Sequence, residues 1–193
     1  AAKSLEIFGY PAPVFIRAIA SEGPSSGPLH TNCYHSPFAH MPGLPICAPM
    51  TPKEYISIWK YYIKNKSPIL VSEHRRSYKQ DKEFLDLVNN KSKISIFTIS
   101  ASRFEMDNLI KELNKEKIKI DIFHILWLKP FIIKKKYIES LNKTKRGIVI
   151  DSTYETCSIS EHIAYKLMKN VKGSTVENLG MEDRSPGCTP KKE

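Results

Sequence analysis

The sequence predicts an α/β fold in which strands of a parallel sheet alternate with helices. Short apolar runs rich in β-branched residues, such as Ile94–Ile99, recur along the chain. Between them lie longer segments in which apolar residues return every three or four positions, as on one face of a helix. Connections between the two kinds of segment are short, which is typical of a wound sheet with helices on both faces.

In the first part of the chain, the sequence pattern predicts two longer strands. A loop, a short extended piece and a helix connect them. The run 13–20 reads as a buried strand, and the glycine- and proline-rich residues 21–28 form a loop at its end. A short extended piece at 44–50 follows. The residues 67–73, "SPILVSE", are the next buried strand, so strand, helix and strand follow the βαβ order of a parallel sheet.

The helix between these strands has a recognisable start. Thr51 is the expected N-cap, Pro52 stands at the first helical position and Glu54 at the third, and the helix then runs to about residue 66. Apolar residues along it share one stripe that we expect to pack on the sheet: Tyr55, Ile58, Trp59, Tyr62 and Ile63.

A charged, weakly periodic segment at 74–93 reads as a linker with one helix, and it divides the chain into two regions. Beyond it a second α/β series begins. Its expected strands are 94–99, 118–126, 147–150 and 175–179, and its expected helices are 103–116, 134–141 and 159–168.

Composition narrows the classes of function. The formal net charge of +10 comes from lysines spread among apolar and acidic residues, as on solvated helix faces, and no nucleic-acid motif accompanies them. The longest apolar runs fall short of the roughly 18 residues of a membrane span, and no signal segment opens the chain. We therefore expect a protein that binds neither nucleic acid nor membrane, in a cytoplasmic setting with reduced cysteines.

The segment "GPLHTNCYHSPFAHMPGLP" at 27–45 concentrates histidines and prolines. His30, Cys33, His35 and His40 have the residue types of zinc ligands, but their spacing matches none of the common ligand patterns. The preceding strand places His30 at the carboxyl edge of a sheet, where ligands of open α/β folds bind. A histidine there can carry a proton near neutral pH, or it can simply cap the loop.

Other catalytic patterns are absent or ambiguous. "GPSSGP" has neither the G-x-S-x-G nucleophile elbow nor the glycine and lysine pattern of a phosphate-binding loop. Asp151, at the end of the strand "RGIVID", is placed either for a polar role or for capping the segment after it.

Taken together, these motifs resemble a known family. "PVFIR" at 13–17, "HTN" at 30–32, "HMPGL" at 40–44 and "SPILVSE" at 67–73 occur in the order found in beta subunits of thiamine-diphosphate-dependent 2-oxoacid dehydrogenases, members of the transketolase superfamily. Later segments, "GIVIDSTYETCSISEHIAYKLM" and "ENLGMEDRSPG", are similar to the carboxyl-terminal domain of that family.

The resemblance implies a domain order. Residues 1–73 would form the C-terminal half of a pyrimidine-binding wound-sheet domain, 74–93 a linker, and 94–193 a transketolase C-terminal α/β domain truncated near its end. In the family, the glutamate that bonds the aminopyrimidine of the cofactor lies upstream of anything matching residue 1. The chain would then be a fragment that is inactive alone.

The resemblance also implies roles for single residues. His30 matches the catalytic histidine beside the thiazolium ring, and His40 matches a histidine with a structural role at a helix end. A potassium site of the family falls on Val14, Tyr62, Ile63, Asn65 and Ser67. Asn65 and Ser67 stand where the family often has Asp and Asn, which removes an anionic ligand. Mg²⁺ would be held by the partner subunit.

The implied function is oxidative decarboxylation of a 2-oxoacid with acyl transfer to lipoamide. The implied partners are an alpha-type subunit, a second beta subunit and a lipoyl acyltransferase component, with thiamine diphosphate shared at a subunit interface. Two alternatives stay open. One is ketol transfer of the transketolase or deoxyxylulose-phosphate-synthase type, and the other is a non-catalytic, partner-binding subunit with the same fold.

Overall fold

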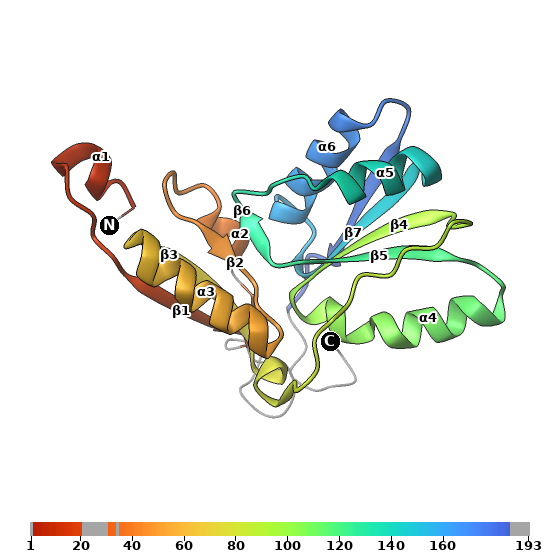
Figure 1. Cartoon of the computed structure of the whole chain (residues 1–193), viewed down its shortest axis with the longest axis horizontal. Helices are drawn as coiled ribbons and strands as arrows, with labels where there is room; N and C mark the ends of the chain where they lie inside the picture. The colour runs from red at the N-terminus through yellow and green to blue at the C-terminus, as the bar shows by residue number, and fades with distance from the viewer. Residues whose placement is uncertain (1, 21–30, 34, 186–193) are drawn as a thin grey trace. The chain divides into compact units, whose positions relative to one another are not determined.

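The chain forms two compact α/β units (Figure 1). The computed structural model describes residues 2–20, 31–33 and 35–185. Unit 1 comprises Ala1–Glu83, Leu126–Pro130 and Arg184–Glu193, and unit 2 comprises Phe84–Ile125 and Phe131–Asp183. The predicted α/β fold class is confirmed.

Unit 1 is built on a four-stranded sheet in the order β1-β3-β2-β6. Its strands are β1 (Phe15–Ala20), β3 (Ile69–His74), β2 (Ile46–Cys47) and β6 (Trp127–Lys129). The first three are parallel, and β6 pairs antiparallel with β2. Its helices are α1 (Ser4–Phe8), α2 (His35–Phe38), α3 (Pro52–Asn65) and the 3-10 turn η1 (Arg75–Lys79).

Helix α3 begins at the predicted position but is capped differently from the expectation. The side chain of Thr51 makes no capping bond. Instead its hydroxyl donates to the Glu83 carboxylate at 2.6 Å, and the same carboxylate accepts the Lys53 amide at 3.0 Å. Glu54 accepts the Met50 amide at 2.8 Å. A carboxylate from 30 residues downstream therefore satisfies one of the open amides at the start of the helix.

The expected apolar stripe of α3 is only partly in the core. Ile58 is buried against Cys47, Ile69 and Val71, with Tyr62 packed beside them. Trp59 and Ile63, in contrast, are 51% and 55% exposed, so these two side chains are not core residues, although the Trp59 ring lies against Phe15 of β1 with centroids 5.4 Å apart.

Unit 2 has four parallel strands in the order β5-β4-β7-β8. The strands are β4 (Ile94–Ile99), β5 (Ile120–Ile125), β7 (Arg146–Tyr154) and β8 (Thr175–Met181), and the helices are α4 (Met106–Lys115), α5 (Lys135–Thr144) and α6 (Ile159–Asn170). The 3-10 turn η2 (Ser100–Glu105) leads into α4. Each predicted strand and helix of this region is present, with ends shifted by a few residues and β7 four residues longer than expected at its carboxyl end.

The charged segment between the two series is more ordered than its composition indicates. It begins inside β3 and continues as η1. Further on, Leu87 pairs with Ile122 of β5 through two backbone hydrogen bonds of 2.8 and 2.9 Å. The division of the chain at 74–93 stays a prediction.

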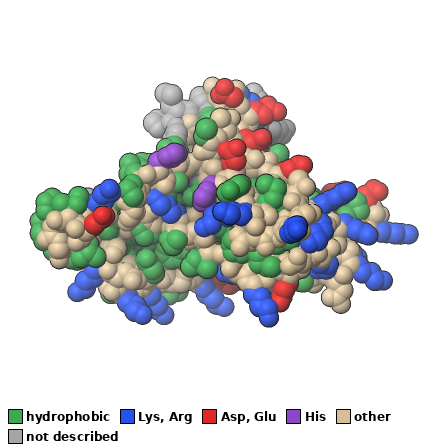
Figure 2. Space-filling model, turned by 90° about the horizontal axis from the view of Figure 1, so that it is seen from above, with side chains coloured by type: hydrophobic (Ala, Val, Ile, Leu, Met, Phe, Trp, Pro, Cys, Tyr) green, Lys and Arg blue, Asp and Glu red, His purple; other side chains and the backbone are tan. Residues whose placement is uncertain are grey.

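Charged side chains are unevenly placed on the face that Figure 2 shows. Lysine and arginine side chains extend outward mainly from its lower and right-hand parts, while acidic side chains gather mainly in its upper part. Hydrophobic side chains gather at the N-terminal end over α1, where Leu5, Ile7 and Phe8 are each at least 60% exposed. Among the described residues, every helix is too short or too polar to span a bilayer.

Candidate functional site

The carboxyl ends of β1 and β3 lie side by side in unit 1. The two strands are parallel and in register, with Ala18 opposite Ser72 and Ala20 opposite His74. Ligands of open parallel sheets bind at this kind of edge, because the loops that follow the strands meet there. His30, the predicted catalytic residue, and the whole of 21–30 lie outside the described residues.

A buried cluster of Cys33, His35 and Ser72 stands at this edge. The Cys33 sulfur lies 3.0 Å from His35 Nδ1 and 3.3 Å from the Ser72 hydroxyl, and these two partners are themselves 3.0 Å apart. Cys33 is 8% exposed, and His35 and Ser72 are almost fully buried. The cluster connects the segment that follows residue 30 to β3.

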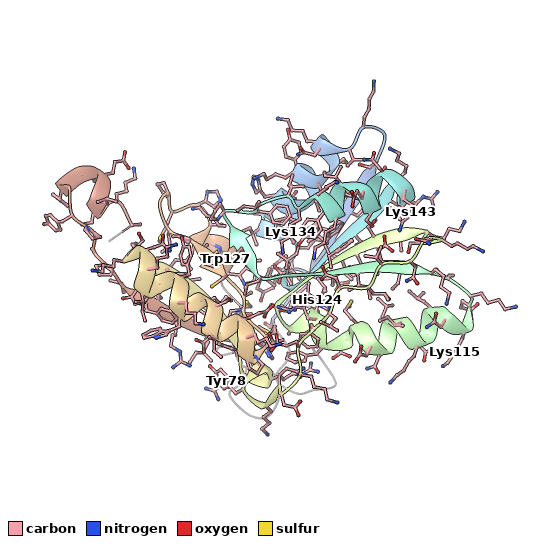
Figure 3. The ribbon with its side chains drawn as sticks, viewed as in Figure 1. Tyr78, Lys115, His124, Trp127, Lys134 and Lys143 are labelled. Atoms are coloured by element: carbon pink, nitrogen blue, oxygen red, sulfur yellow. The ribbon has the colours of Figure 1, made fainter. Side chains whose placement is uncertain are left out.

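The opposite side of β3 carries an ion pair. Arg17 of β1 donates to both carboxylate oxygens of Glu73, at 2.8 and 2.7 Å, and the Tyr78 hydroxyl donates to Glu73 at 2.6 Å. Glu73 is buried while Arg17 is half exposed. Burial and the bond to Glu73 raise the pKa of Tyr78, so its hydroxyl stays protonated and donating. Figure 3 shows Tyr78 projecting from η1. This network joins the two strands near their carboxyl ends.

A lysine holds the turn after α2. The Lys129 ammonium donates to the carbonyls of Ala39 and Met41, and burial lowers its pKa. His40, between these two carbonyls, is exposed. The anchor of this turn is therefore a side chain from β6, which lies about 90 residues away in sequence.

The predicted potassium positions lie near the end of α3 and the starts of β1 and β3. The Val14 carbonyl accepts the Ile69 amide at 3.0 Å, and the Tyr62 carbonyl accepts the Lys66 amide at 2.9 Å. The Asn65 carbonyl accepts the Ser67 hydroxyl at 3.2 Å. Three of these carbonyls thus already hold hydrogen bonds within the chain. Every oxygen in the set is neutral. Neutral carbonyl oxygens coordinate K⁺ in other proteins, but here no anionic ligand adds to them.

Asp151 lies inside β7 and is 3% exposed. Capping of the segment after it, the structural alternative for this residue, is wrong because residues 152–154 continue the strand. The next helix, α6, is capped by Ser158, whose hydroxyl accepts the Glu161 amide at 3.2 Å. Within the described ranges, no group of three or more His, Cys, Asp or Glu side chains is arranged to hold a metal ion.

Two units with parallel-rich sheets, the first with polar side chains at its carboxyl edge, define a protein of the α/β class. The model of the family "Transketolase, C-terminal domain" matches residues 85–193. The chain belongs to this family.

Curated relatives extend the similarity to the first unit. The chain is 26% identical over 203 residues to the acetoin:2,6-dichlorophenolindophenol oxidoreductase subunit beta of Cupriavidus necator, covering 98% of this chain and 59% of the relative. It is 26% identical over 172 residues to the pyruvate dehydrogenase E1 component subunit beta of Chlorokybus atmophyticus, covering 83% of this chain and 51% of the relative. The chain thus spans between half and three fifths of the length of these relatives.

A solved structure has the same fold. It is described as a split gene transketolase, inactive beta4 tetramer, and it superposes with a TM-score of 0.70 at 16% identity over 90% of this chain and 59% of that chain. The resemblance predicted from sequence is confirmed as membership of the transketolase C-terminal family with distant similarity to dehydrogenase beta subunits.

Sequence reasoning missed the contacts that build this edge. Ser72 and Glu73 read only as the end of an apolar strand, although alternation along a strand places them on opposite faces. Cys33 and His35 were considered only as metal ligands. Their contact with Ser72 joins residues 37 and 39 positions apart, and no local pattern encodes it.

Proposed function

We propose that this chain is part of the beta subunit of a thiamine-diphosphate-dependent 2-oxoacid dehydrogenase. The observation that carries the proposal is the distant similarity to curated beta subunits over nearly the whole chain, including the strands that frame the candidate site. The reaction is oxidative decarboxylation of a 2-oxoacid, followed by acyl transfer to lipoamide.

In this proposal, His30 is the catalytic residue supplied by the chain. Its sequence neighbour Thr31 is buried, and Cys33 contacts Ser72 close to the carboxyl end of β3. These contacts anchor the segment beside His30 at the edge where ligands of such sheets bind. Thiamine diphosphate, when bound, supplies the carbon nucleophile that attacks the 2-oxo group. His30 moves a proton to or from the substrate oxygen.

The remaining parts of the site come from partners. An alpha-type subunit holds the diphosphate and Mg²⁺, a second beta subunit completes the assembly, and a lipoyl acyltransferase component receives the acyl group. Exposed apolar side chains on α1 and α3 support a subunit interface on unit 1, because monomeric proteins rarely leave such groups open to water.

A potassium ion at Val14, Tyr62, Ile63, Asn65 and Ser67 is the least supported part of the proposal, since these positions offer neutral oxygens only. If K⁺ binds there, the melting temperature of unit 1 rises in KCl relative to NaCl at equal ionic strength. Equal melting temperatures in both salts would remove the ion from the proposal.

The experiment combines the intact protein with the alpha-type subunit of the same organism. We expect reduction of an artificial electron acceptor that requires both a 2-oxoacid and thiamine diphosphate. A panel of pyruvate, branched-chain 2-oxoacids and acetoin identifies the substrate. No turnover with any 2-oxoacid of the panel, or turnover that does not need thiamine diphosphate, would contradict the proposal, even if acetoin is turned over.

Two controls separate the alternatives. The His30→Asn variant is expected to lower kcat by at least about 100-fold, the usual contribution of a general acid or base, while the complex still assembles. Turnover that requires sugar phosphates would favour ketol transfer. A stable complex without turnover by any donor would favour the non-catalytic partner-binding subunit.

A further inference from the structure

We propose that Cys33 is a modification site, a thiol that His35 activates for oxidation by a hydroperoxide. The site consists of Cys33, His35 and Ser72, and it is independent of the thiamine chemistry proposed above. The carrying observation is the 3.0 Å contact between the Cys33 sulfur and His35 Nδ1 inside a buried polar cluster. A thiolate is the reactive form of cysteine, and a neighbouring imidazole promotes its formation.

The geometry gives His35 the role of proton acceptor. Nδ1 lies 3.0 Å from both the Cys33 sulfur and the Ser72 hydroxyl. When Nδ1 is unprotonated, it accepts a hydrogen bond from the thiol or from the hydroxyl. Transfer of the thiol proton to Nδ1 leaves a thiolate beside an imidazolium. The Ser72 hydroxyl, 3.3 Å from the sulfur, competes with the thiol for Nδ1 before this transfer.

The described residues beside Ser72 on β3 and β1 add no uncompensated carboxylate on the face of β3 that carries the cluster. His74 is on the same side of the strand as Ser72, and its Nδ1 accepts the Arg76 amide. Glu73 is on the other side and is neutralised by Arg17. Across the sheet, the β1 residue opposite Ser72 is Ala18, which carries no charge.

The oxidation step balances without any further reactant. The thiolate sulfur attacks one oxygen of hydrogen peroxide, an S–O bond forms and the O–O bond breaks. Sulfur is oxidised by two electrons to a sulfenic acid, and the leaving hydroxide takes the imidazolium proton to become water. Hydrogen peroxide is the smallest hydroperoxide, which suits a cysteine residue that is only 8% exposed.

The two other described cysteines provide internal references. Cys47 is fully buried on β2, and burial raises the pKa of its thiol, so it is expected to stay unreactive while the fold is intact. Cys157 is exposed. Neither of them has a histidine contact like that of Cys33 among the described hydrogen bonds.

The test measures sulfenic acid formation at each cysteine of the intact protein. Hydrogen peroxide is added between pH 6.5 and 8.5, sulfenic acid is trapped with dimedone, and peptide mass spectrometry quantifies each site. For a free thiol with a pKa near 8.5, the thiolate fraction falls about 50-fold over this range. We expect the Cys33 rate to fall by less than about fivefold.

Two variants separate activation from packing. His35→Gln is expected to slow Cys33 labelling at pH 6.5 by about tenfold or more, whereas His162→Gln, an exposed control, leaves it unchanged. Ser72→Ala removes the competitor for Nδ1 and is expected to preserve or raise the rate. Continued protection of Cys47 in the same spectra shows that each variant is folded.

The proposal is overturned by either of two results. One is Cys33 labelling that falls with pH as steeply as that of a free thiol, or that does not occur in the folded protein. The other is His35→Gln labelling at an unchanged or higher rate. If His35→Gln exposes Cys47, the Ser72→Ala variant decides, and a tenfold loss of Cys33 labelling in it overturns the proposal.

Discussion

The edge strands of the two sheets differ in how far they are buried. Strand β5 stands at one edge of the unit 2 sheet, and five of its six residues are buried. The segment 84–89 covers it: Leu87 pairs with Ile122, and the His124 amide donates to Asp86 at 2.9 Å. Strand β1 stands at the edge of the unit 1 sheet, and one of its six residues is buried.

This difference shows which unit is complete within the described residues. Parallel strands are normally buried on both faces, and an open apolar edge invites pairing with another segment. Unit 2 protects its edge with its own chain. Unit 1 leaves Ile19 of β1 and the apolar residues of α1 exposed, which supports a role in a larger assembly.

The two tryptophans, Trp59 and Trp127, both belong to unit 1. Figure 3 labels Trp127, whose ring packs against Tyr61 of α3 with centroids 4.7 Å apart. Tryptophan fluorescence therefore reports unfolding of unit 1, while far-UV circular dichroism reports both units. Comparing the two signals during urea unfolding assigns each effect below to its unit.

The largest expected loss of stability is that of the Asp121→Ala variant in unit 2. This fully buried carboxylate of β5 accepts hydrogen bonds from the Asn89 amide, Ser92, Ser140 and Lys143. Asp121→Ala leaves all four donors without this acceptor, and we expect a loss of about 3 to 5 kcal/mol in unfolding free energy. The circular dichroism transition should shift while the fluorescence transition stays. Asp107→Ala, an exposed control, is expected to cost at most about 0.5 kcal/mol.

The same carboxylate predicts an acid limit for unit 2. Burial opposes its ionisation, but the hydrogen bonds from Asn89, Lys143, Ser140 and Ser92 outweigh burial and lower the pKa of Asp121. Because the folded pKa lies below the unfolded one, this contribution is present above about pH 4 and is lost as pH falls through the folded value. A stability loss below pH 4 that Asp121→Ala leaves unchanged would contradict this assignment.

Two isoleucine-to-alanine variants on α3 test which face of this helix is buried in the core of unit 1. Ile58 is 1% exposed and Ile63 is 55% exposed. Ile58→Ala is expected to lower the unfolding free energy by about 3 kcal/mol through the cavity it leaves, and Ile63→Ala by less than about 1 kcal/mol. Fluorescence-monitored urea unfolding measures both. Equal losses would mean that Ile63 is buried, for example by an associated copy.

We expect His124 to give the stability of unit 2 a second dependence on pH, between pH 7 and about pH 4. Burial, and then the charge of Arg103, lower the pKa of His124 to about 4, and its ring stacks on Phe84 with centroids 5.2 Å apart. The unfolded state binds a proton first, so stability falls by about 2 kcal/mol from pH 7 to pH 4.5 and levels off only below the folded pKa of about 4. His124→Phe keeps a stacking ring and should abolish most of this dependence. His162→Gln should not.

The smallest expected effect concerns the edge of unit 1. Tyr78→Phe removes one of the donors to Glu73 but leaves Arg17 in place, and we expect a loss of about 1 kcal/mol in the fluorescence-monitored transition. Tyr165→Phe, on an exposed side chain of α6, is the control. A loss of more than about 3 kcal/mol would contradict this account, because it would mean that the bond from the hydroxyl contributes more than one ordinary hydrogen bond to a charged group.

Local patterns in the sequence predicted most of the elements, because each strand and helix carries its own periodicity. The pattern at Ile94–Ile99 predicted both ends of that strand correctly. Strand β6 was missed because its three residues have no period of their own, and they become a strand only by pairing with β2. The cap of α3 by Glu83 was missed for a related reason, since the acceptor comes from outside the helix.

The candidate site was predictable only in outline. The order of strands predicted a carboxyl edge on unit 1, and the place of His30 at that edge stays a prediction. The buried contacts among Cys33, His35 and Ser72 depend on the tertiary fold. The exposure of Trp59 could not be read from α3 either, because helical periodicity identifies an apolar stripe but not its partner.

Binding of thiamine diphosphate tests the central claim most directly. Isothermal titration calorimetry compares the intact protein alone, the alpha-type subunit alone and their complex, each with Mg²⁺ present. If the cofactor site is completed between subunits, the complex binds thiamine diphosphate at least about tenfold more tightly than either component. Equal affinity for the complex and for one component alone would contradict the claim that this chain contributes to the cofactor site.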